Sequence, residues 1–367
     1  MADGKTALQL AATAGHESVA QLLLDNSAEA AGRHDDCNDT PLMYAVAAGQ
    51  EGMTRLLLNQ VGFNITNTDR WTPLTCAIRN GHSAIVEALL QSDSFSDLDI
   101  HVGLSMACQS GQKEIVKLLL APDVWVSIDG EVRDEYYKEF PPLAHAINQK
   151  HVEILEVLLA HEGTDVNVTC MFESLPDCPA LCLAAAVGFE AGVEMLLAHP
   201  GIEINSENKH GVTALGIAAE RGHARIVEIL LACDGIDHNH VSRAGQTPLS
   251  IAAYIGQESA ARVLLNDPRV IIWGRHWLSG ETAFMLAAKQ GHEKIVRLFL
   301  ARSEDNREYG KLLAREALEA AQAKGHWNIV ALLLESSVEG RVDRWPDPWD
   351  FEGFQGSSSG GIGYYIQ

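Results

Sequence analysis

The chain has 367 residues, which is longer than one ordinary domain, and with 47% hydrophobic and 21% charged residues its composition is that of a folded protein. Its formal net charge of −22 disfavours nucleic acid and anionic membrane surfaces as partners, because both carry negative charge. The sequence has neither an apolar run long enough to span a membrane nor a secretion signal at its start, so we expect no membrane partner.

A glycine followed by a predicted helix with the apolar pattern Ile/Val-x-x-Leu-Leu recurs along the whole chain. Successive occurrences lie 30 to 39 residues apart, so the sequence predicts about ten repeat units over residues 1–334. The widest spacings predict longer connections at about 121–140 and 160–179. The ten anchor positions are Gly15, Gly49, Gly81, Gly111, Lys150, Gly188, Gly222, Gly256, Gly291 and Gly325.

Each unit is predicted to be a pair of helices, and the seventh unit shows the pattern well. Thr213 is a candidate N-cap whose hydroxyl can accept an amide of the first helical turn. Leu215, Ala218 and Ala219 then form a face of mostly small residues that lets neighbouring helices pack closely. Gly222 ends this helix in a left-handed conformation, and the apolar residues of 226–231 recur at helical spacing. Stacking of units buries both helices.

These motifs resemble the ankyrin repeat. Thr72-Pro73-Leu74 and Thr247-Pro248-Leu249 match its first helix, and Gly-His pairs such as Gly222-His223 match the start of its second. The resemblance covers about nine tenths of the chain. It implies an all-α ankyrin-repeat solenoid of about ten helix-turn-helix units with hairpin-like connecting loops, similar to the long arrays of fungal ankyrin-repeat proteins.

The middle of the array departs most from the pattern. Units four, five, six and ten lack the capping Thr, and Lys150 replaces the left-handed glycine of unit five. Both changes weaken a helix end, so we predict that residues 100–190 open first and residues 205–300 last. The residues that replace the Thr are Val102, Pro141, Pro179 and Glu316.

Residues 335–367 leave the repeat pattern and form an acidic, aromatic and then Gly/Ser-rich tail. The aromatic segment 344–351 either caps the last repeat or serves as a docking motif, and we favour the cap.

Catalytic and metal-binding motifs find little support in the sequence. His238 and His240 are expected to be exposed hairpin residues, and the spacing of Cys170, Cys178 and Cys182 fits no familiar zinc module. Seven cysteines without framework spacing predict reduced thiols and an intracellular location, cytoplasmic, nuclear or both. We therefore expect no enzyme, no cofactor and no metal site.

The resemblance implies that the hairpin tips and the exposed side of the first helices bind a partner protein. The chain is then a non-enzymatic scaffold or adaptor, and we expect it to be a monomer. The alternative is the recognition portion of a larger enzyme or ubiquitin-ligase component. Arg, Trp and Tyr at these positions are typical of binding hot spots, although Trp71 and Trp277 could instead cover neighbouring hairpins. The candidate partner-binding residues are Arg70, Trp71, Arg79, Asn80, Lys209, His210, Glu220, Arg221, Arg243, Gln246, Tyr254, Trp277, Glu281 and Lys289.

Overall fold

The computed structural model describes residues 5–26, 33–59, 66–68, 71–92, 96–121, 141–172, 175–276, 279–302 and 307–338. The chain forms two compact parts, residues 1–248 and residues 249–367. The C-terminal tail, including the aromatic segment 344–351, lies outside the described residues, as do Arg70 and Trp277.

The described residues form twenty α-helices that pair in chain order, as the repeat predicts. The first helices of the pairs are α1 (Ala7–Ala14), α3 (Pro41–Ala47), α5 (Pro73–Arg79), α7 (Asp97–Ser110), α9 (Pro142–Asn148), α11 (Ala180–Val187), α13 (Ala214–Arg221), α15 (Pro248–Ile255), α17 (Ala283–Gln290) and α19 (Arg307–Lys324). The second helices are α2 (Glu17–Asn26), α4 (Glu51–Leu58), α6 (Ser83–Leu90), α8 (Lys113–Leu119), α10 (Val152–Leu159), α12 (Glu190–Ala198), α14 (Ala224–Leu231), α16 (Glu258–Asn266), α18 (Glu293–Arg302) and α20 (Trp327–Val338).

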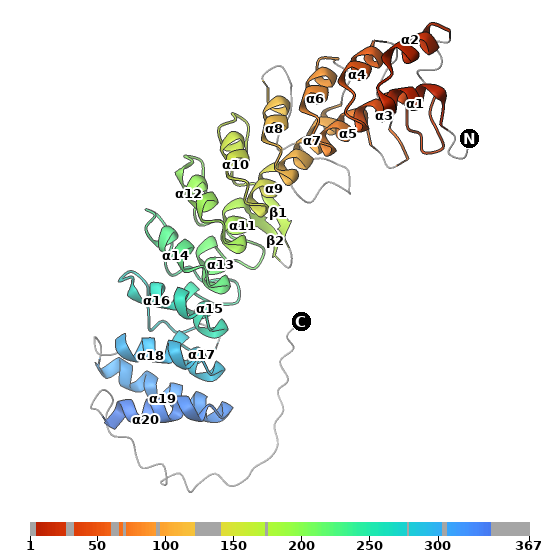
Figure 1. Ribbon diagram of the computed structural model, residues 1–367. Helices are drawn as coiled ribbons and strands as arrows, with labels where there is room; N and C mark the ends of the chain where they lie inside the picture. Colours follow the sequence, from red (N-terminus) through yellow and green to blue (C-terminus); the bar gives the residue numbers. More distant parts are fainter. Residues whose placement is uncertain are drawn as a thin grey trace. The chain divides into compact units, whose positions relative to one another are not determined.

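Like helices stack on like within each part. In residues 1–248 the first helices α1 to α13 follow one another in a row, and the second helices α2 to α14 form a parallel row beside them (Figure 1). In residues 249–367, α16, α18 and α20 contact in turn, and α17 packs on α19. The side chains predicted to pack closely in unit seven, Leu215, Ala218 and Ala219, are all 0% exposed. The predicted solenoid of helix pairs is thus confirmed, and its core lies between stacked units.

The anchor between the two helices of each pair has the predicted left-handed conformation. The nine anchor glycines have φ angles of 69° to 97°, and Lys150 has φ 59° although it carries a side chain. Like His82 over Gly49, four further histidines lie over the anchor of the preceding unit, and these four also bond to its backbone. Each donates from Nε2 to a backbone carbonyl there, at 2.9–3.4 Å: His151 to Gln109, His223 to Ala186, His292 to Tyr254 and His326 to Lys289. These bonds tie consecutive units together.

Unit six lacks this contact, and its sequence accounts for the change. Phe189 stands where other units have His or Gln, and the anchor of the preceding unit is Lys150 instead of glycine. The Phe189 ring turns inward, is 5% exposed and packs against Gly192. The Lys150 ammonium donates to the carbonyl of Gly188 at 3.4 Å. Lys150, the anchor with a side chain, is thus followed by the unit in which Phe189 replaces the histidine.

Side-chain N-caps occur at four of the predicted Thr positions, and one predicted cap is missing. The hydroxyls of Thr6, Thr40, Thr72 and Thr282 accept the amide three residues on, at 3.2–3.3 Å, and their ψ angles are 161° to 163°. Thr213 makes no such bond, so its predicted cap is wrong, and its Oγ1 is buried without a partner. Its ψ is 170°, against 161° to 163° at the four capped positions.

The units without the capping Thr start their first helices in two ways. Val102 and Glu316 lie inside longer helices, because α7 begins at Asp97 and α19 at Arg307. At α7 the Ser96 hydroxyl accepts the Asp99 amide, and the Asp99 carboxylate accepts the Ser96 amide in return. The predicted weak helix start of unit four is therefore wrong. Pro141 and Pro179 do begin α9 and α11 without a side-chain cap.

The long connection predicted at 160–179 contains a small β-hairpin. Strands β1 (Thr169–Phe172) and β2 (Leu175–Pro179) pair antiparallel, with Cys170 opposite Cys178, and both strands contact α11 (Figure 1). The other long connection falls on 122–140, outside the described residues. The strands are an addition to an otherwise helical fold.

Candidate functional site

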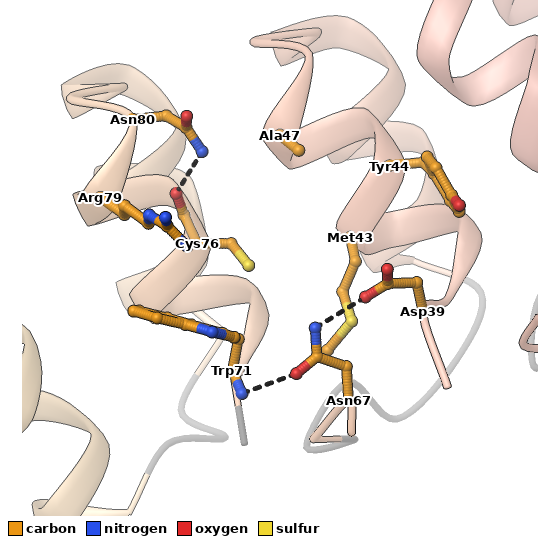
Figure 2. Close-up of a pocket in the computed structure, with 9 residues that line it drawn as sticks. All are labelled: Asp39, Met43, Tyr44, Ala47, Asn67, Trp71, Cys76, Arg79 and Asn80. Atoms are coloured by element: carbon orange, nitrogen blue, oxygen red, sulfur yellow. Dashed lines mark hydrogen bonds between the residues drawn. The ribbon is translucent and has the colours of Figure 1, made fainter. Parts of the chain in front are cut away.

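A pocket of about 310 Å³ opens between the first helices of units two and three. Three of the predicted partner-binding residues, Trp71, Arg79 and Asn80, lie on its unit-three side (Figure 2). The sequence interpretation did not single out the other six lining residues, which are Asp39, Met43, Tyr44, Ala47, Asn67 and Cys76. The repeat alignment could have predicted two of these, because Asp39 and Ala47 occupy in unit two the positions that Trp71 and Arg79 occupy in unit three.

The hairpin tip of unit three is fixed by Asn67. Its Oδ1 accepts the amide of Trp71 at 2.8 Å, and its Nδ2 donates to Oδ1 of Asp39 at 2.9 Å (Figure 2). The amide of Thr68 also donates to the carbonyl of Cys37 in the neighbouring tip, at 2.9 Å. An Asn side chain that bonds backbone four residues on closes a turn without a partner strand. Trp71 is thus held at the pocket edge by its own turn and by the adjacent unit.

Arg79 ends α5 and lies over the indole of Trp71. The guanidinium carbon is 4.8 Å from the ring centroid, a cation–π contact. Arg79 is exposed and Trp71 half-buried, so both remain accessible from solvent. Asn80 is the C-cap of the helix, and its side chain donates to the carbonyl of Cys76 at 2.8 Å. The stacking holds the guanidinium in one orientation at the mouth of the pocket.

Tyr44 on α3 also lines the pocket, and its ring lies on the side of α3 away from Trp71 (Figure 2). Its hydroxyl donates to Oδ2 of Asp35 at 2.7 Å, and the Lys5 ammonium lies 4.9 Å from the ring centroid. Burial and the hydrogen bond to Asp35 raise the pKa of Tyr44. Burial alone would raise the pKa of Asp35, but hydrogen bonds from Tyr44 and from the amides of Cys37 and Asp39 lower it below its usual value. At neutral pH Tyr44 is therefore a phenol that donates to the Asp35 carboxylate.

The floor of the pocket is apolar. Met43 is 2% exposed, Cys76 is half-buried, and Ala47 is an exposed methyl group. Burial, followed by the nearby Asp39 carboxylate, raises the pKa of the Cys76 thiol to about 11, so the thiol is neutral. Unit two carries the small Ala47 at the repeat position where unit three carries Arg79. The unit-two side of the pocket is therefore left unfilled at this position. An apolar floor with a polar rim suits one side chain of a binding partner.

The remaining predicted residues lie elsewhere in the two parts. Lys209, His210 and Arg221 are exposed and Glu220 is half-buried; the Arg243 amide donates to the His210 carbonyl at 3.1 Å. Gln246 is half-buried. In residues 249–367, Tyr254 is 40% exposed, and Lys289 pairs with Glu281 at 2.7 Å. None of these residues lines the pocket, and their role in binding stays a prediction.

The histidines and cysteines that the sequence raised as metal ligands have other surroundings. His238 and His240 are half-buried, not exposed as expected, and His240 lies 3.2 Å from a Glu207 oxygen. Cys170, Cys178 and Cys182 are buried free thiols. Across the described ranges, no group of three or more His, Cys, Asp or Glu residues is arranged to hold a metal ion. Nor does any helix in those ranges have the length and apolarity to cross a membrane.

Family comparison matches most of the chain. The family described as ankyrin repeats (3 copies) matches residues 8–102, 95–170 and 181–272, and the one described as ankyrin repeat matches 279–307. The ankyrin repeat protein nuc-2 of Neurospora crassa is 31% identical over an alignment of 219 residues that covers 50% of this chain and 20% of that protein. An ankyrin repeat and KH domain-containing protein of Caenorhabditis briggsae is 31% identical over 170 residues, 45% of this chain and 6% of that protein.

Two solved structures share the fold. The ankyrin repeat domain of human ASB11 superposes with a TM-score of 0.51 at 24% identity, covering 64% of this chain and all (100%) of that domain. The ankyrin repeat domain of Bcl-3 gives a TM-score of 0.54 at 25% identity, covering 62% of this chain and 99% of that domain. The chain spans about a fifth of the length of nuc-2 and less of the other curated relative, so the similarity concerns the repeat region of longer proteins.

Proposed function

This chain belongs to the ankyrin-repeat family, and we propose that it is a non-enzymatic scaffold or adaptor that binds another protein through its hairpin tips and first helices. Ankyrin repeats generally mediate protein–protein interaction. The observation that carries the proposal is the pocket of units two and three, where an exposed Arg and a half-buried Trp flank an apolar floor. Aromatic and Arg side chains next to a pocket are typical of binding hot spots.

Other features of the chain fit this role. All seven cysteines are free thiols, which supports an intracellular location. The excess of acidic residues argues against nucleic acid as the partner. We further propose that the chain is monomeric, with its recognition surface open to a different protein.

The short coverage of the curated relatives favours a second reading at the level of the whole protein. The matched region is 20% of nuc-2 and 10% of a cation channel homologue of Caenorhabditis elegans, which is 27% identical over 128 residues. In this reading the chain is the recognition portion of a larger enzyme or ubiquitin-ligase component. The binding surface is the same in both readings, and sequence that adjoins the chain distinguishes them.

The test is differential capture of partners. The full chain, a Trp71→Ala/Arg79→Ala variant and a control Arg55→Ala variant are used as bait, and bound proteins are quantified by mass spectrometry. Arg55 is exposed on the second helix α4, so the control removes a charge away from the pocket. We expect a protein that the wild type and the control retain and the pocket variant loses. A set of bound proteins that is identical for all three baits contradicts the proposal.

A further inference from the structure

Arg79 is the one polar side chain of the pocket whose hydrogen-bonding groups have no acceptor among the described residues. The carboxylate of Asp39 accepts from Asn67, Asn80 donates to Cys76, and Tyr44 donates to Asp35. Within the described residues, the contact that holds Arg79 is the face of the Trp71 ring. A guanidinium presents five N–H donors in a planar fork, so the donors at the mouth of the pocket are directed to solvent.

Arg79 lacks the carboxylate partner that many arginines of this acidic chain have. The protein has 49 Asp and Glu residues against 27 Lys and Arg, and seven other described arginines each form an ion pair with a carboxylate. Those seven are Arg55, Arg225, Arg262, Arg269, Arg275, Arg297 and Arg315. Where those arginines contact a carboxylate, Arg79 contacts the Trp71 ring. The ring covers one face of the guanidinium, and the N–H donors at the guanidinium edge stay available to a ligand.

We propose that the pocket binds a short acidic peptide segment of a partner protein, with an apolar side chain on the floor beside Trp71 and an Asp or Glu carboxylate on Arg79. This inference rests on the proposed function and specifies the partner's chemistry at that surface. Arg binds carboxylates through two parallel hydrogen bonds. Because Trp71 already orients the guanidinium, less side-chain entropy is lost on binding.

A basic segment fits the same pocket poorly. Its cation would meet Arg79 at the mouth, and Oδ1 of Asp39 is already bonded to Asn67. The net charge of −22 repels an acidic segment at long range. The apolar side chain must therefore contribute much of the affinity through its contacts with Met43 and Cys76, and the carboxylate contributes selectivity.

The test is an array of synthetic nonapeptides probed with the purified full chain. Each peptide carries Leu or Phe, or Ser as the apolar-free control, beside Asp/Glu, Asn/Gln or Lys/Arg. We expect binding only for peptides that combine an apolar residue with an acidic one. Arg79→Gln should weaken these peptides at least tenfold, and Arg79→Lys should recover part of the loss, because Lys keeps the charge but not the fork. Arg55→Gln, a loss of the same charge on α4, should bind as the wild type does.

A second readout locates the bound peptide. With the indole nitrogens of tryptophan labelled, the NMR signal of Trp71, assigned by its disappearance in Trp71→Phe, should move on addition of an acidic apolar peptide. A preference for Lys/Arg peptides, or equal affinity of the wild type and Arg79→Gln, overturns the inference. If a captured protein depends on Trp71 but not on Arg79, the inference fails and the proposed function stands. If neither proteins nor peptides respond to the pocket variants, both fail.

Discussion

The anchor glycines are required both for backbone conformation and for space. At Gly291, φ is 86°, and a Cβ would lie 2.8 Å from Cε1 of the His326 ring. At Gly325, φ is 77°, but the nearest atom to such a Cβ is the Trp327 ring nitrogen at 4.0 Å. The two positions thus share the left-handed conformation and differ in whether an imidazole of the next unit covers the glycine.

Substituting alanine at Gly291 and at Gly325 separates the requirement for backbone conformation from the requirement for space. Both Gly291→Ala and Gly325→Ala place a side chain in the left-handed region, which costs roughly 1–2 kcal/mol. Gly291→Ala also displaces the His326 ring, and such overpacking typically costs about 1–3 kcal/mol more. Urea unfolding should show the larger loss of stability for Gly291→Ala. Equal losses would mean that the histidine contacts do not couple units.

Burial makes one histidine a source of pH-dependent stability. Most of the His145 side chain, on α9, is shielded from solvent, and this burial lowers its pKa from 6.5 to about 4. Between these values the unfolded chain binds a proton at His145 that the folded chain does not. The folded protein therefore keeps its full stability above pH 6.5 and loses stability as the pH falls towards 4. Between pH 7 and pH 5 the loss amounts to about 2 kcal/mol.

His145→Gln should flatten this pH dependence. The free energy of unfolding, measured in urea at pH 7 and at pH 5, should fall less for the variant than for the wild type. His34→Gln, at an exposed position, is the matched control and should keep the wild-type difference. A variant that loses as much stability as the wild type between the two pH values would show that His145 takes up its proton in the folded state at ordinary pH.

At the scale of a helix, caps decide how each unit begins. Thr282 caps α17 through its hydroxyl, whereas Thr213, at the same repeat position before α13, has a buried hydroxyl without a partner. Replacing the hydroxyl with a methyl group by Thr282→Val should cost about 1 kcal/mol, the usual value for a lost N-cap. Thr213→Val should be neutral or stabilising, because it removes an unsatisfied buried oxygen. Thermal unfolding of the two variants gives the comparison, and a larger loss for Thr213→Val would show that its hydroxyl is bonded.

The helices show where sequence reasoning succeeds and where it stops. The anchors Gly15 to Gly325 were predictable, because the left-handed position needs glycine and recurs with the repeat. The early start of α7 was missed, because the repeat aligns Val102 with a helix start while Ser96 and Asp99 form a capping box outside that register. The pocket was only half predictable, since it depends on small Ala47 facing large Arg79 across two units. No single-unit motif contains that pairing.

At the scale of the whole chain, stability is expected to vary along the array, because each unit contacts only its neighbours. The structure removes unit four from the predicted weak region and leaves units five and six. There α9 and α11 begin at prolines without side-chain caps, Lys150 has a left-handed conformation, and Phe189 replaces the imidazole that ties units together. These features lie within 141–198.

Hydrogen exchange with mass spectrometry resolves this variation. Backbone amides of α9 to α12 should exchange faster than those of α13 and α14, because local opening costs less where Lys150 is held in the left-handed region and where Phe189 replaces the histidine that bonds to the preceding unit. Lys150→Gly is the accompanying variant: it relieves the left-handed side chain and should slow exchange across α9 and α10. Protection of α9 to α12 equal to that of α13 and α14 would show that the β1–β2 hairpin offsets these defects.

The central claim is that the chain binds a protein through the side of the repeats that carries Trp71 and Arg79. A photo-crosslinking amino acid in place of Asn80, at the pocket rim, or in place of Arg55, on α4, tests it directly inside cells. Both positions are exposed, so neither substitution disturbs the core. Illumination should give a discrete protein adduct from position 80 and none from position 55. Adducts of the same protein from both positions, or none from position 80, would contradict the account.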